Sequence, residues 1–330
     1  MSFVLNAEDL SSINQYLRER KWIAPDEELK SASKPGEGNM NYVLRLRTSF
    51  RTFIIKQARP YVEKYPQIPA PTERALIEAK FYELIQKNEV LRRYTPELSN
   101  LDEENFVLTL EDLGESSDYT YLYQKGKTLE KEDLNQLMRF LSILHGNYTD
   151  PSEAPILRNL KMRSLNAEHI FHYPFLEQNG FDLDTITPGL QEEAMSYKTD
   201  RTLKAEIKSL SQSYLSDGNT LLHGDYYPGS WLKTFDGIKI IDPEFSFFGP
   251  AEFDISIVVA HLMMAQAGQE LLPKVLAVYD RRSSLDLRLL DQLTGIEIMR
   301  RIIGLAQLPL SLSLEEKSAL LIEARNLILG

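Results

Sequence analysis

The stretch TLLHGDYYPGSWLKTFDGIKIIDPEF, residues 220–245, carries the strongest structural signal in the chain. Apolar residues lead into the polar turn HGD at 223–225. The segments WLKTF and IKIID then lie on either side of Asp-Gly at 236–237, and this pattern predicts a β-hairpin. The hairpin runs into DPE at 242–244. Because the two loops follow neighbouring strands, we expect their three carboxylates to lie close together.

Such a cluster indicates phosphate chemistry. Carboxylates that lie close together disfavour full ionisation, and a divalent cation relieves their repulsion. Mg²⁺ suits a site with few carboxylate ligands and bound phosphates. We therefore expect Asp242 and Glu244 to hold Mg²⁺ on the phosphates of ATP, and Asp225 to orient a substrate hydroxyl and accept its proton.

The upstream sequence supplies complementary groups. Two β-rich stretches after residue 34 predict a hairpin that begins with Gly36 and Gly38, where the backbone can approach a phosphate closely. Lys56 ends the apolar strand FIIK, and Glu78 lies on the helix expected over 71–87, where it can pair with the lysine. Each feature alone is typical of an ordinary turn or a solvated surface. Their order along the chain matches the parts of a kinase.

The coarse organisation is α+β. The first ~110 residues mix helices with short local strands, whereas helices dominate later, for example over 130–146 and 187–216. We expect a small β-rich lobe over 1–112 and a larger, mainly helical lobe over 113–330, with the ligand in the cleft between the lobes.

Composition limits the partners and the chemistry. The 330 residues carry 37 basic and 48 acidic side chains, and a net charge of −11 argues against a nucleic-acid-coating surface. The absence of cysteine excludes disulfides, thiolate zinc sites and a cysteine nucleophile, and none of the five histidines lies in an HExxH motif. Neither a signal peptide nor an apolar run of about 20 residues is evident, so we expect a cytoplasmic location and no membrane partner.

Several stretches resemble the aminoglycoside phosphotransferase/choline kinase superfamily, and within it the methylthioribose kinase branch. They are GEGNMNYVLRL (36–46), IIKQARPYV (54–62), RALIEAKFY (74–82), FVLTLEDL (106–113), LLHGDYYPGS (221–230), IIDPEFSFFGPAEFDI (240–255) and EIMRRIIGLAQ (297–307). The resemblance implies a two-lobed protein-kinase-like fold and ATP-dependent phosphorylation of a small-molecule hydroxyl, with 5-methylthioribose of methionine salvage as the acceptor. An aminoglycoside, choline or another sugar is the alternative acceptor. A catalytically silent nucleotide-binding scaffold is the alternative class, and a homodimer is left open.

The resemblance also implies roles for single residues. Asp225 resembles the catalytic aspartate. The metal ligands it implies are Asp242, Glu244 and Ser230, the last standing where protein kinases have a metal-binding Asn. The ATP contacts it implies are Gly36, Gly38, Asn39, Lys56, Glu78, Glu111 and Leu113, the last two in the hinge that reads adenine. Arg300 and Arg301 resemble the substrate-binding pair. We expect at most one of them to face the site squarely and the other to flank it or to pair with a carboxylate.

Residues beside the HGD turn have two interpretations. Tyr226, Tyr227 and Trp231 could form a substrate wall, and the alternative is that they pack in the core. His223 is expected to brace the turn rather than to bind metal. Asp254 is a candidate N-cap of the following helix and could also hold the turn.

Overall fold

The computed structural model describes residues 3–36, 40–266, 271–279 and 285–330. Contacts divide the chain into two compact units, Met1–Ser116 with Lys239–Phe245 and Ser117–Ile238 with Ser246–Gly330. The short segment with the DPE motif therefore groups with the N-terminal part, although it lies late in the sequence. Within the described ranges, no helix combines the length and apolar character that a membrane span requires.

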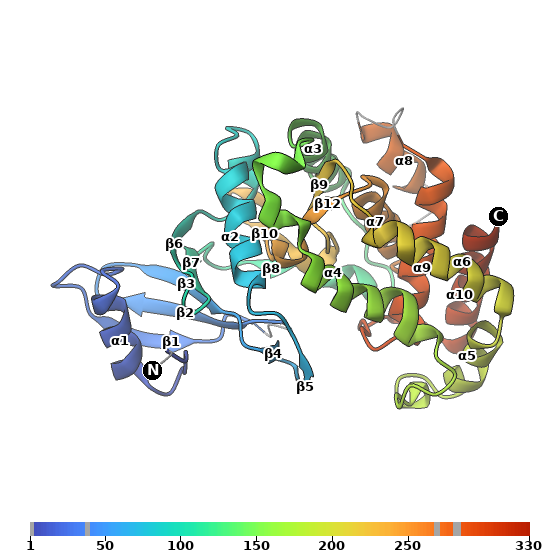
Figure 1. Cartoon of the computed structure of the whole chain (residues 1–330), viewed down its shortest axis with the longest axis horizontal. Coiled ribbons are helices and arrows are strands. Elements are labelled where there is room, and N and C mark those ends of the chain that lie inside the picture. Colours follow the sequence, from blue (N-terminus) through green and yellow to red (C-terminus); the bar gives the residue numbers. More distant parts are fainter. Residues whose placement is uncertain (1–2, 37–39, 267–270, 280–284) are drawn as a thin grey trace. The chain divides into compact units, whose positions relative to one another are not determined.

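The first unit is built on an antiparallel sheet of five strands in the order β1-β2-β3-β7-β6. The strands, blue to teal in Figure 1, are β1 (Leu29–Ser33), β2 (Tyr42–Thr48), β3 (Thr52–Gln57), β6 (Leu98–Asp102) and β7 (Val107–Glu111). Between β3 and β6 the chain forms the hairpin of β4 (Tyr61–Val62) and β5 (Tyr65–Pro69) and then the helix α2 (Arg74–Ile85). Central strand β3 consequently pairs with β2 on one side and β7 on the other.

The core of this unit follows from alternation along the strands. In β2, Leu44 and Leu46 are buried while the arginines between and after them are more exposed. They pack with residues of α1 (Leu10–Glu19), such as Ile13 and Leu17. The helix begins where the Asp9 carboxylate accepts a hydrogen bond from the Ser12 backbone N–H at 2.9 Å.

Helix α2 is buried on most of its surface and includes two buried charges, Arg74 and Glu78. It packs against the 3₁₀ turn Pro243–Phe245 of the DPE segment and against β6 and β7. Buried charges persist only where they are paired and hydrogen-bonded. The position of α2 therefore requires partners for both side chains, and the DPE segment supplies some of them.

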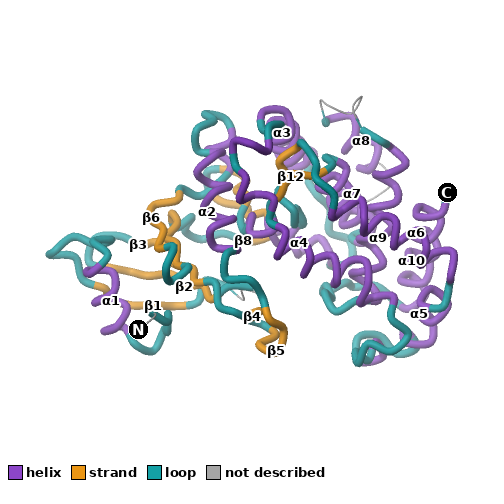
Figure 2. The backbone as a smooth tube through the Cα atoms, viewed as in Figure 1, coloured by secondary structure: helices purple, strands orange, loops and turns teal. Residues whose placement is uncertain are grey.

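The second unit is mainly helical, as the purple segments in Figure 2 show. Its helices are α3 (Lys131–Asn147), α4 (Leu160–Ala167), α5 (Leu190–Lys198), α6 (Arg201–Leu215), α7 (Glu252–Met264), α8 (Leu271–Val278), α9 (Leu287–Ile303) and α10 (Leu314–Leu329). Helix α9 is largely buried and packs against both α7 and α10. A Cβ atom at Gly295 would lie 2.4 Å from the Ala324 carbonyl oxygen, so glycine permits the close approach of α9 and α10.

The remaining short strands are β8 (Ser117–Asp118), β9 (Thr220–Leu222), β10 (Trp231–Thr234), β11 (Gly237–Ile240) and β12 (Phe247–Gly249). The predicted turn between WLKTF and IKIID is displaced by one residue. It consists of Phe235 and Asp236, and Gly237 begins β11 with a φ of +104°, a left-handed conformation that glycine adopts without strain. The predicted helical run over 187–216 is interrupted, because Asp200 caps α6 by accepting from the Leu203 N–H.

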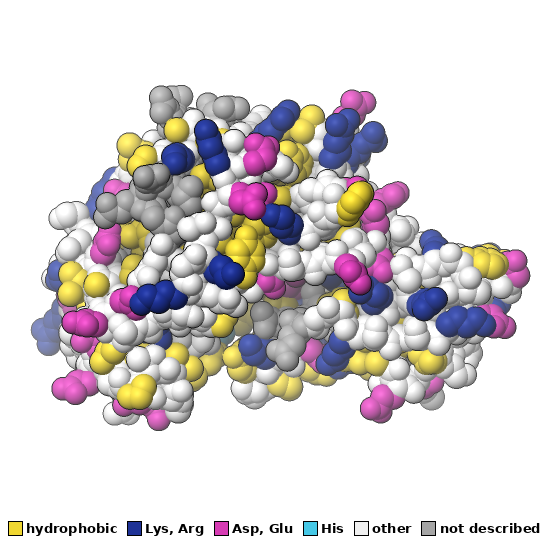
Figure 3. Space-filling model, turned by 180° about the vertical axis from the view of Figure 1, so that it is seen from behind, with side chains coloured by type: hydrophobic (Ala, Val, Ile, Leu, Met, Phe, Trp, Pro, Cys, Tyr) yellow, Lys and Arg dark blue, Asp and Glu magenta, His cyan; other side chains and the backbone are white. Residues whose placement is uncertain are grey.

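Charged side chains of both signs are mixed on the face that Figure 3 shows. Lysine and arginine side chains lie among aspartate and glutamate side chains, and neither kind covers a continuous area of that face.

Candidate active site

The HGD turn leaves β9, which pairs with β12 so that Leu222 lies opposite Phe247. The Asp254 carboxylate accepts hydrogen bonds from the backbone N–H groups of His223 (2.7 Å) and Gly224 (2.9 Å). Gly224 has a φ of +86°. Asp254 is the third residue of α7 and Ala251 is the N-cap, so the expected capping role is wrong, whereas the side chain does hold the turn.

Asp225 follows in the same turn, with a side chain that is 24% exposed. Its backbone N–H donates to His223 Nδ1 at 3.3 Å, and its carbonyl oxygen accepts from Ser230 Oγ at 2.9 Å. His223 thus braces the turn as expected. The hydroxyl of Ser230 therefore hydrogen-bonds within the same turn. Its role as a metal ligand stays a prediction.

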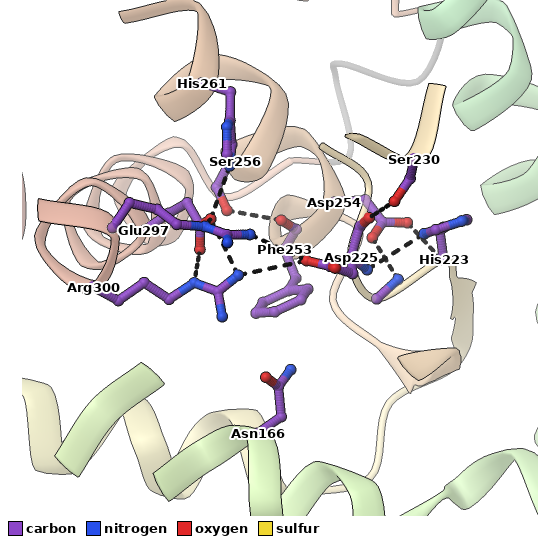
Figure 4. Close-up of polar contacts among 12 residues, drawn as sticks. Asn166, His223, Asp225, Ser230, Phe253, Asp254, Ser256, His261, Glu297 and Arg300 are labelled. Carbon is purple, nitrogen blue, oxygen red and sulfur yellow. Dashed lines mark hydrogen bonds and ion pairs between the residues drawn. The ribbon is translucent and has the colours of Figure 1, made fainter. Parts of the chain in front are cut away.

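Two arginines on α9 contact Asp225. Arg300 Nη2 lies 3.5 Å and Arg301 Nη2 lies 3.3 Å from the same oxygen, Asp225 Oδ1. We expected at most one of them to face the site squarely and the other to flank it or to pair with a carboxylate; both pair with this same carboxylate. The Cα atoms point about 100° apart, but long side chains on one helix can converge on a common partner. Figure 4 shows the approach of Arg300 to Asp225.

Glu297, which we did not single out from the sequence, binds both arginines. Its Oε1 accepts from Arg301 Nε at 2.8 Å and from Arg300 Nη2 at 3.2 Å, and its Oε2 accepts from Arg300 Nε. His261 Nε2 lies 2.9 Å from Oε1 on the other side. The signal was present, because side chains three and four residues apart lie on one helix face.

Burial and charge compete at these carboxylates. Burial raises the pKa of Asp225, although Arg301 and Arg300 oppose that rise. At Glu297 burial also acts upward, but the two arginines dominate and hold the pKa well below its usual value. Glu297 is therefore ionised, while Asp225 has the higher proton affinity that suits an acceptor of a substrate proton.

In the first unit, the structure brings Lys56 and Glu78 together. Lys56 Nζ lies 2.7 Å from Glu78 Oε1 and also forms an ion pair with Asp242. Burial alone would lower the pKa of Lys56, but Asp242 and Glu78 outweigh it and raise the pKa well above the usual value. The lysine is therefore a fixed positive charge between a helix carboxylate and the DPE segment.

The two carboxylates of the DPE segment have different surroundings. Asp242 has a side chain that is 44% exposed and a φ of +64°, a left-handed conformation found mainly in Gly, Asn and Asp. Glu244 is buried, and its Oε2 lies 2.9 Å from Asn41 Nδ2 and 3.3 Å from Arg74 Nε. Burial raises the pKa of Glu244 to about 8, and Arg74 opposes the rise.

Within the described residues, no group of three or more Asp, Glu, His or Cys side chains could hold a metal ion. Asp242 nevertheless fits a cation that takes its other ligands from phosphate and water, the usual arrangement for Mg²⁺. Glu244 already has Asn41 and Arg74 as partners.

The other predicted nucleotide contacts are partly described. Gly38 and Asn39 lie outside the described residues. A Cβ atom at Gly36 would meet nothing within 4 Å. Glu111 ends β7, and its N–H donates to the Glu97 carbonyl oxygen at 2.9 Å; Leu113 follows two residues later.

The predicted substrate wall is mostly core. Tyr226 and Trp231 have no exposed surface and pack against each other, and Trp231 also packs against Tyr119, so neither lines a site. Trp231 lies at the start of β10, next to the 3₁₀ turn 228–230. Tyr227 is only partly buried, and the Arg301 guanidinium lies 4.9 Å from its ring centroid. Of the three aromatic residues of the predicted wall, only Tyr227 therefore borders the arginine pair.

Residues 36–291 match the sequence model of the phosphotransferase enzyme family APH. The chain belongs to this family. The resemblance inferred from the motifs is thereby confirmed, and the family supplies the general class of reaction, phosphoryl transfer.

This APH-family chain is similar to curated relatives in sequence and to solved structures in fold. A methylthioribose kinase of Yersinia pseudotuberculosis is 29% identical over 296 residues, covering 84% of this chain and 69% of the relative. One of Bacillus cereus is 30% identical over 252 residues, covering 71% and 61%. Choline kinase from Streptococcus pneumoniae shares the fold, with a TM-score of 0.52, 13% identity, and 96% of this chain and 98% of that chain covered. An AMP-bound spectinomycin phosphotransferase also shares it, with a TM-score of 0.52, 15% identity, and 96% of this chain and 98% of that chain covered. The predicted α+β fold is confirmed.

Proposed function

We propose that the protein transfers a phosphoryl group from ATP to a hydroxyl of a small neutral sugar, with 5-methylthioribose as the acceptor. Membership of the APH family and the similarity to methylthioribose kinases support this proposal. The observation that carries it is the convergence of Arg300 and Arg301 on one carboxylate oxygen of Asp225.

The charges around Asp225 favour a neutral acceptor. Two guanidiniums and the carboxylates of Asp225 and Glu297 balance each other. A cationic acceptor such as choline would meet two like charges beside the reacting carboxylate, which disfavours its binding. Sugar hydroxyls, in contrast, can accept hydrogen bonds from guanidinium groups.

In this mechanism, Asp225 orients the attacking hydroxyl and accepts its proton. Its raised pKa makes it a better proton acceptor than an exposed aspartate. Arg300 and Arg301 position the sugar and stabilise the negative charge that develops on the transferred group. Most of the rate acceleration comes from positioning and charge stabilisation, as in other phosphoryl transfers.

The first unit supplies the nucleotide contacts in this proposal. Lys56, which Glu78 holds in place, binds phosphate oxygens, and the hairpin at Gly36 covers them. The backbone at Glu111 and Leu113 binds adenine. Asp242 holds Mg²⁺, which when bound neutralises phosphate charge, and Glu244 supports the Asp242 segment through Arg74 and Asn41.

The test is a comparison of acceptors. ADP release is measured with ATP and Mg²⁺ in the presence of 5-methylthioribose, ribose, choline or spectinomycin. We expect 5-methylthioribose to give the highest kcat/KM, by about 100-fold over choline, because recognition of hydroxyl groups discriminates strongly. A preference for choline or spectinomycin would overturn the assignment of the acceptor, and no turnover with any acceptor would overturn the assignment as a kinase.

The substitution Asp225→Asn separates chemistry from nucleotide binding. We expect kcat to fall by roughly 10²–10⁴-fold, the usual contribution of a general base. Binding of ADP, measured by calorimetry, should be retained because the proposed nucleotide contacts belong to the other unit. Full activity of this variant would show that Asp225 is not the proton acceptor.

A further inference from the structure

A buried chain of polar side chains lies behind the arginine pair. Tyr123 OH lies 2.5 Å from His261 Nδ1, and His261 Nε2 lies 2.9 Å from Glu297 Oε1. Glu297 in turn binds Arg300 and Arg301, which reach Asp225. All of these residues except Asp225 are at least nine-tenths buried. Figure 4 shows His261 and Glu297 on the side of Arg300 away from Asn166.

The protons in this chain can be assigned from its partners. Burial lowers the pKa of His261 to about 4, so the imidazole is neutral and has one donor and one acceptor nitrogen. Ionised Glu297 can only accept hydrogen bonds, so the Nε2–H group of His261 donates to Glu297. The other ring nitrogen, Nδ1, then accepts a hydrogen bond from the Tyr123 hydroxyl. The chain therefore runs in one direction, from Tyr123 through His261 to Glu297.

Glu297 sets the rotation of both guanidiniums. It takes the Nε–H of each arginine, and the Nη2 atom of each then lies against Asp225. In the part of the chain that the structure describes, neither Nη1 atom makes a hydrogen bond. Figure 4 shows one terminal nitrogen of Arg300 turned away from Asp225. Both Nη1 groups are consequently free to donate to a bound acceptor, together with the second N–H of Arg301 Nη2.

We propose that Glu297 is a positioning residue for phosphoryl transfer: it holds Arg300 and Arg301 side by side with Nη2 on Asp225 and Nη1 toward the acceptor. This inference rests on the proposed function, which takes Asp225 as the proton acceptor and the arginines as acceptor contacts. Glu297 also balances one of the two positive charges. Without it, both guanidiniums would have Asp225 as their sole carboxylate, which would hold Asp225 in ion pairs and weaken it as a base.

The experiment compares Glu297→Gln with Asp291→Asn. Both substitutions remove one negative charge from α9, but Asp291 is exposed and two turns from the arginine pair. Glutamine keeps the size of the side chain but offers an amide where Arg300 or Arg301 needs an acceptor. We expect kcat/KM for the sugar to fall by about 100-fold in Glu297→Gln, the cost of a misplaced reacting group, with no change in the KM for ATP. Asp291→Asn should alter neither value.

A combination of variants tests whether Glu297 acts through the arginines. In the background Arg300→Lys/Arg301→Lys, Glu297→Gln should cause no further loss, because residues of one network are not additive. A full additional loss in that background would overturn the proposal, as would wild-type kcat/KM in Glu297→Gln. Thermal unfolding of each variant identifies a loss of activity that is caused by a loss of folded protein.

Hydrogen exchange measured by NMR tests the positioning of the arginines without depending on the proposed function. Buried, hydrogen-bonded arginine Nε–H groups exchange slowly with solvent, and Arg300→Lys and Arg301→Lys assign their signals. We expect both slow signals in the wild type and in Asp291→Asn, and rapid exchange in Glu297→Gln. If no acceptor were turned over but this pattern held, the function would be wrong while the positioning would stand. Unchanged slow signals in Glu297→Gln would overturn the positioning itself.

Discussion

The two units each carry a group of ionisable side chains, and the groups differ in exposure. The first-unit cluster comprises Lys56, Arg74, Glu78, Asp242 and Glu244. The second-unit cluster comprises Asp225, Glu297, Arg300 and Arg301. Because burial raises the pKa of Glu244 to about 8, neither cluster has a clear excess of charge near neutral pH. The most exposed carboxylate of the first cluster is Asp242, at 44%, whereas that of the second is Asp225, at 24%.

This difference separates two recognition tasks. A well-exposed carboxylate such as Asp242 can reach a metal cation in solvent, and a lysine beside it attracts phosphate. The second cluster is mostly buried and offers directed hydrogen bonds without net charge, which suits a neutral acceptor. Substitutions that change the charge of either cluster test whether the two clusters have these separate functions.

The largest expected effect comes from Lys56→Met. Removal of the ammonium leaves Glu78 buried without its cation, and such broken buried pairs cost about 3–5 kcal/mol of unfolding free energy. Urea denaturation measures this loss. Lys80→Met on α2 is the control, since Lys80 pairs with Glu83 at the surface and should change stability little. The double variant Lys56→Met/Glu78→Gln should regain much of the loss, and equal stability of Lys56→Met and wild type would contradict the buried pair.

His261, which hydrogen-bonds to Glu297 of the second-unit cluster, makes the free energy of unfolding depend on pH. Burial lowers its pKa from 6.5 to about 4, so the unfolded chain takes up the proton first as the pH falls. Stability is therefore present above pH 6.5 and is lost between about 6.5 and 4, on the order of 3 kcal/mol from this group. Unfolding free energies across this range should show a shallower slope in His261→Gln. The exposed His172→Gln is the control, and identical slopes in all three proteins would refute the assignment.

The exposed carboxylate of the first cluster can be tested with Mg²⁺ and ADP. At a concentration about 100 times the Kd, Mg²⁺–ADP should stabilise the wild type by about 2.7 kcal/mol, and chelation with EDTA should remove most of this gain. Asp242→Asn should lose the Mg²⁺-dependent part, because it removes the exposed carboxylate. Asp225→Asn should keep it. Loss of the effect in Asp225→Asn but not in Asp242→Asn would reverse the two assignments.

The smallest effect is expected at Gly229. A Cβ atom there would lie 2.4 Å from the Tyr227 ring, so Gly229→Ala must displace the ring from Arg301. Such a cation–π contact contributes about 1 kcal/mol, which corresponds to an increase of about 5-fold in the KM for the acceptor. In the background Tyr227→Leu the same substitution should change nothing. An effect that persists in that background would show that Gly229 acts by another route.

The residues that sequence reasoning identified and those it missed differ in kind. Lys56, Glu78 and Asp242 come from three separate segments, yet their order in the chain indicated a common site, and the structure brings them together. Glu297 lies within one turn of two arginines that were identified, and it was missed. A glutamate on a charged helix is most often solvated, and the pattern does not reveal that this face of α9 is buried.

Burial also explains the other differences. Trp231 beside a reactive aspartate is compatible with a substrate wall or a core residue, and the packing of Tyr119 and Tyr226 places it in the core. Both DPE carboxylates have the same chemistry in isolation. They differ because Asn41 and Arg74 surround Glu244, whereas Asp242 faces solvent.

Local pattern alone established the order of helices and strands, the reactive turns and the family, since periodicity, turn residues and motifs are properties of neighbouring residues. Folding established which charges are buried and which partners they have. Arg74, Glu244 and Glu297 are buried because distant segments or whole helices exclude water from them. A buried charge requires a partner far more than an exposed one does, so their pairing follows from the tertiary structure.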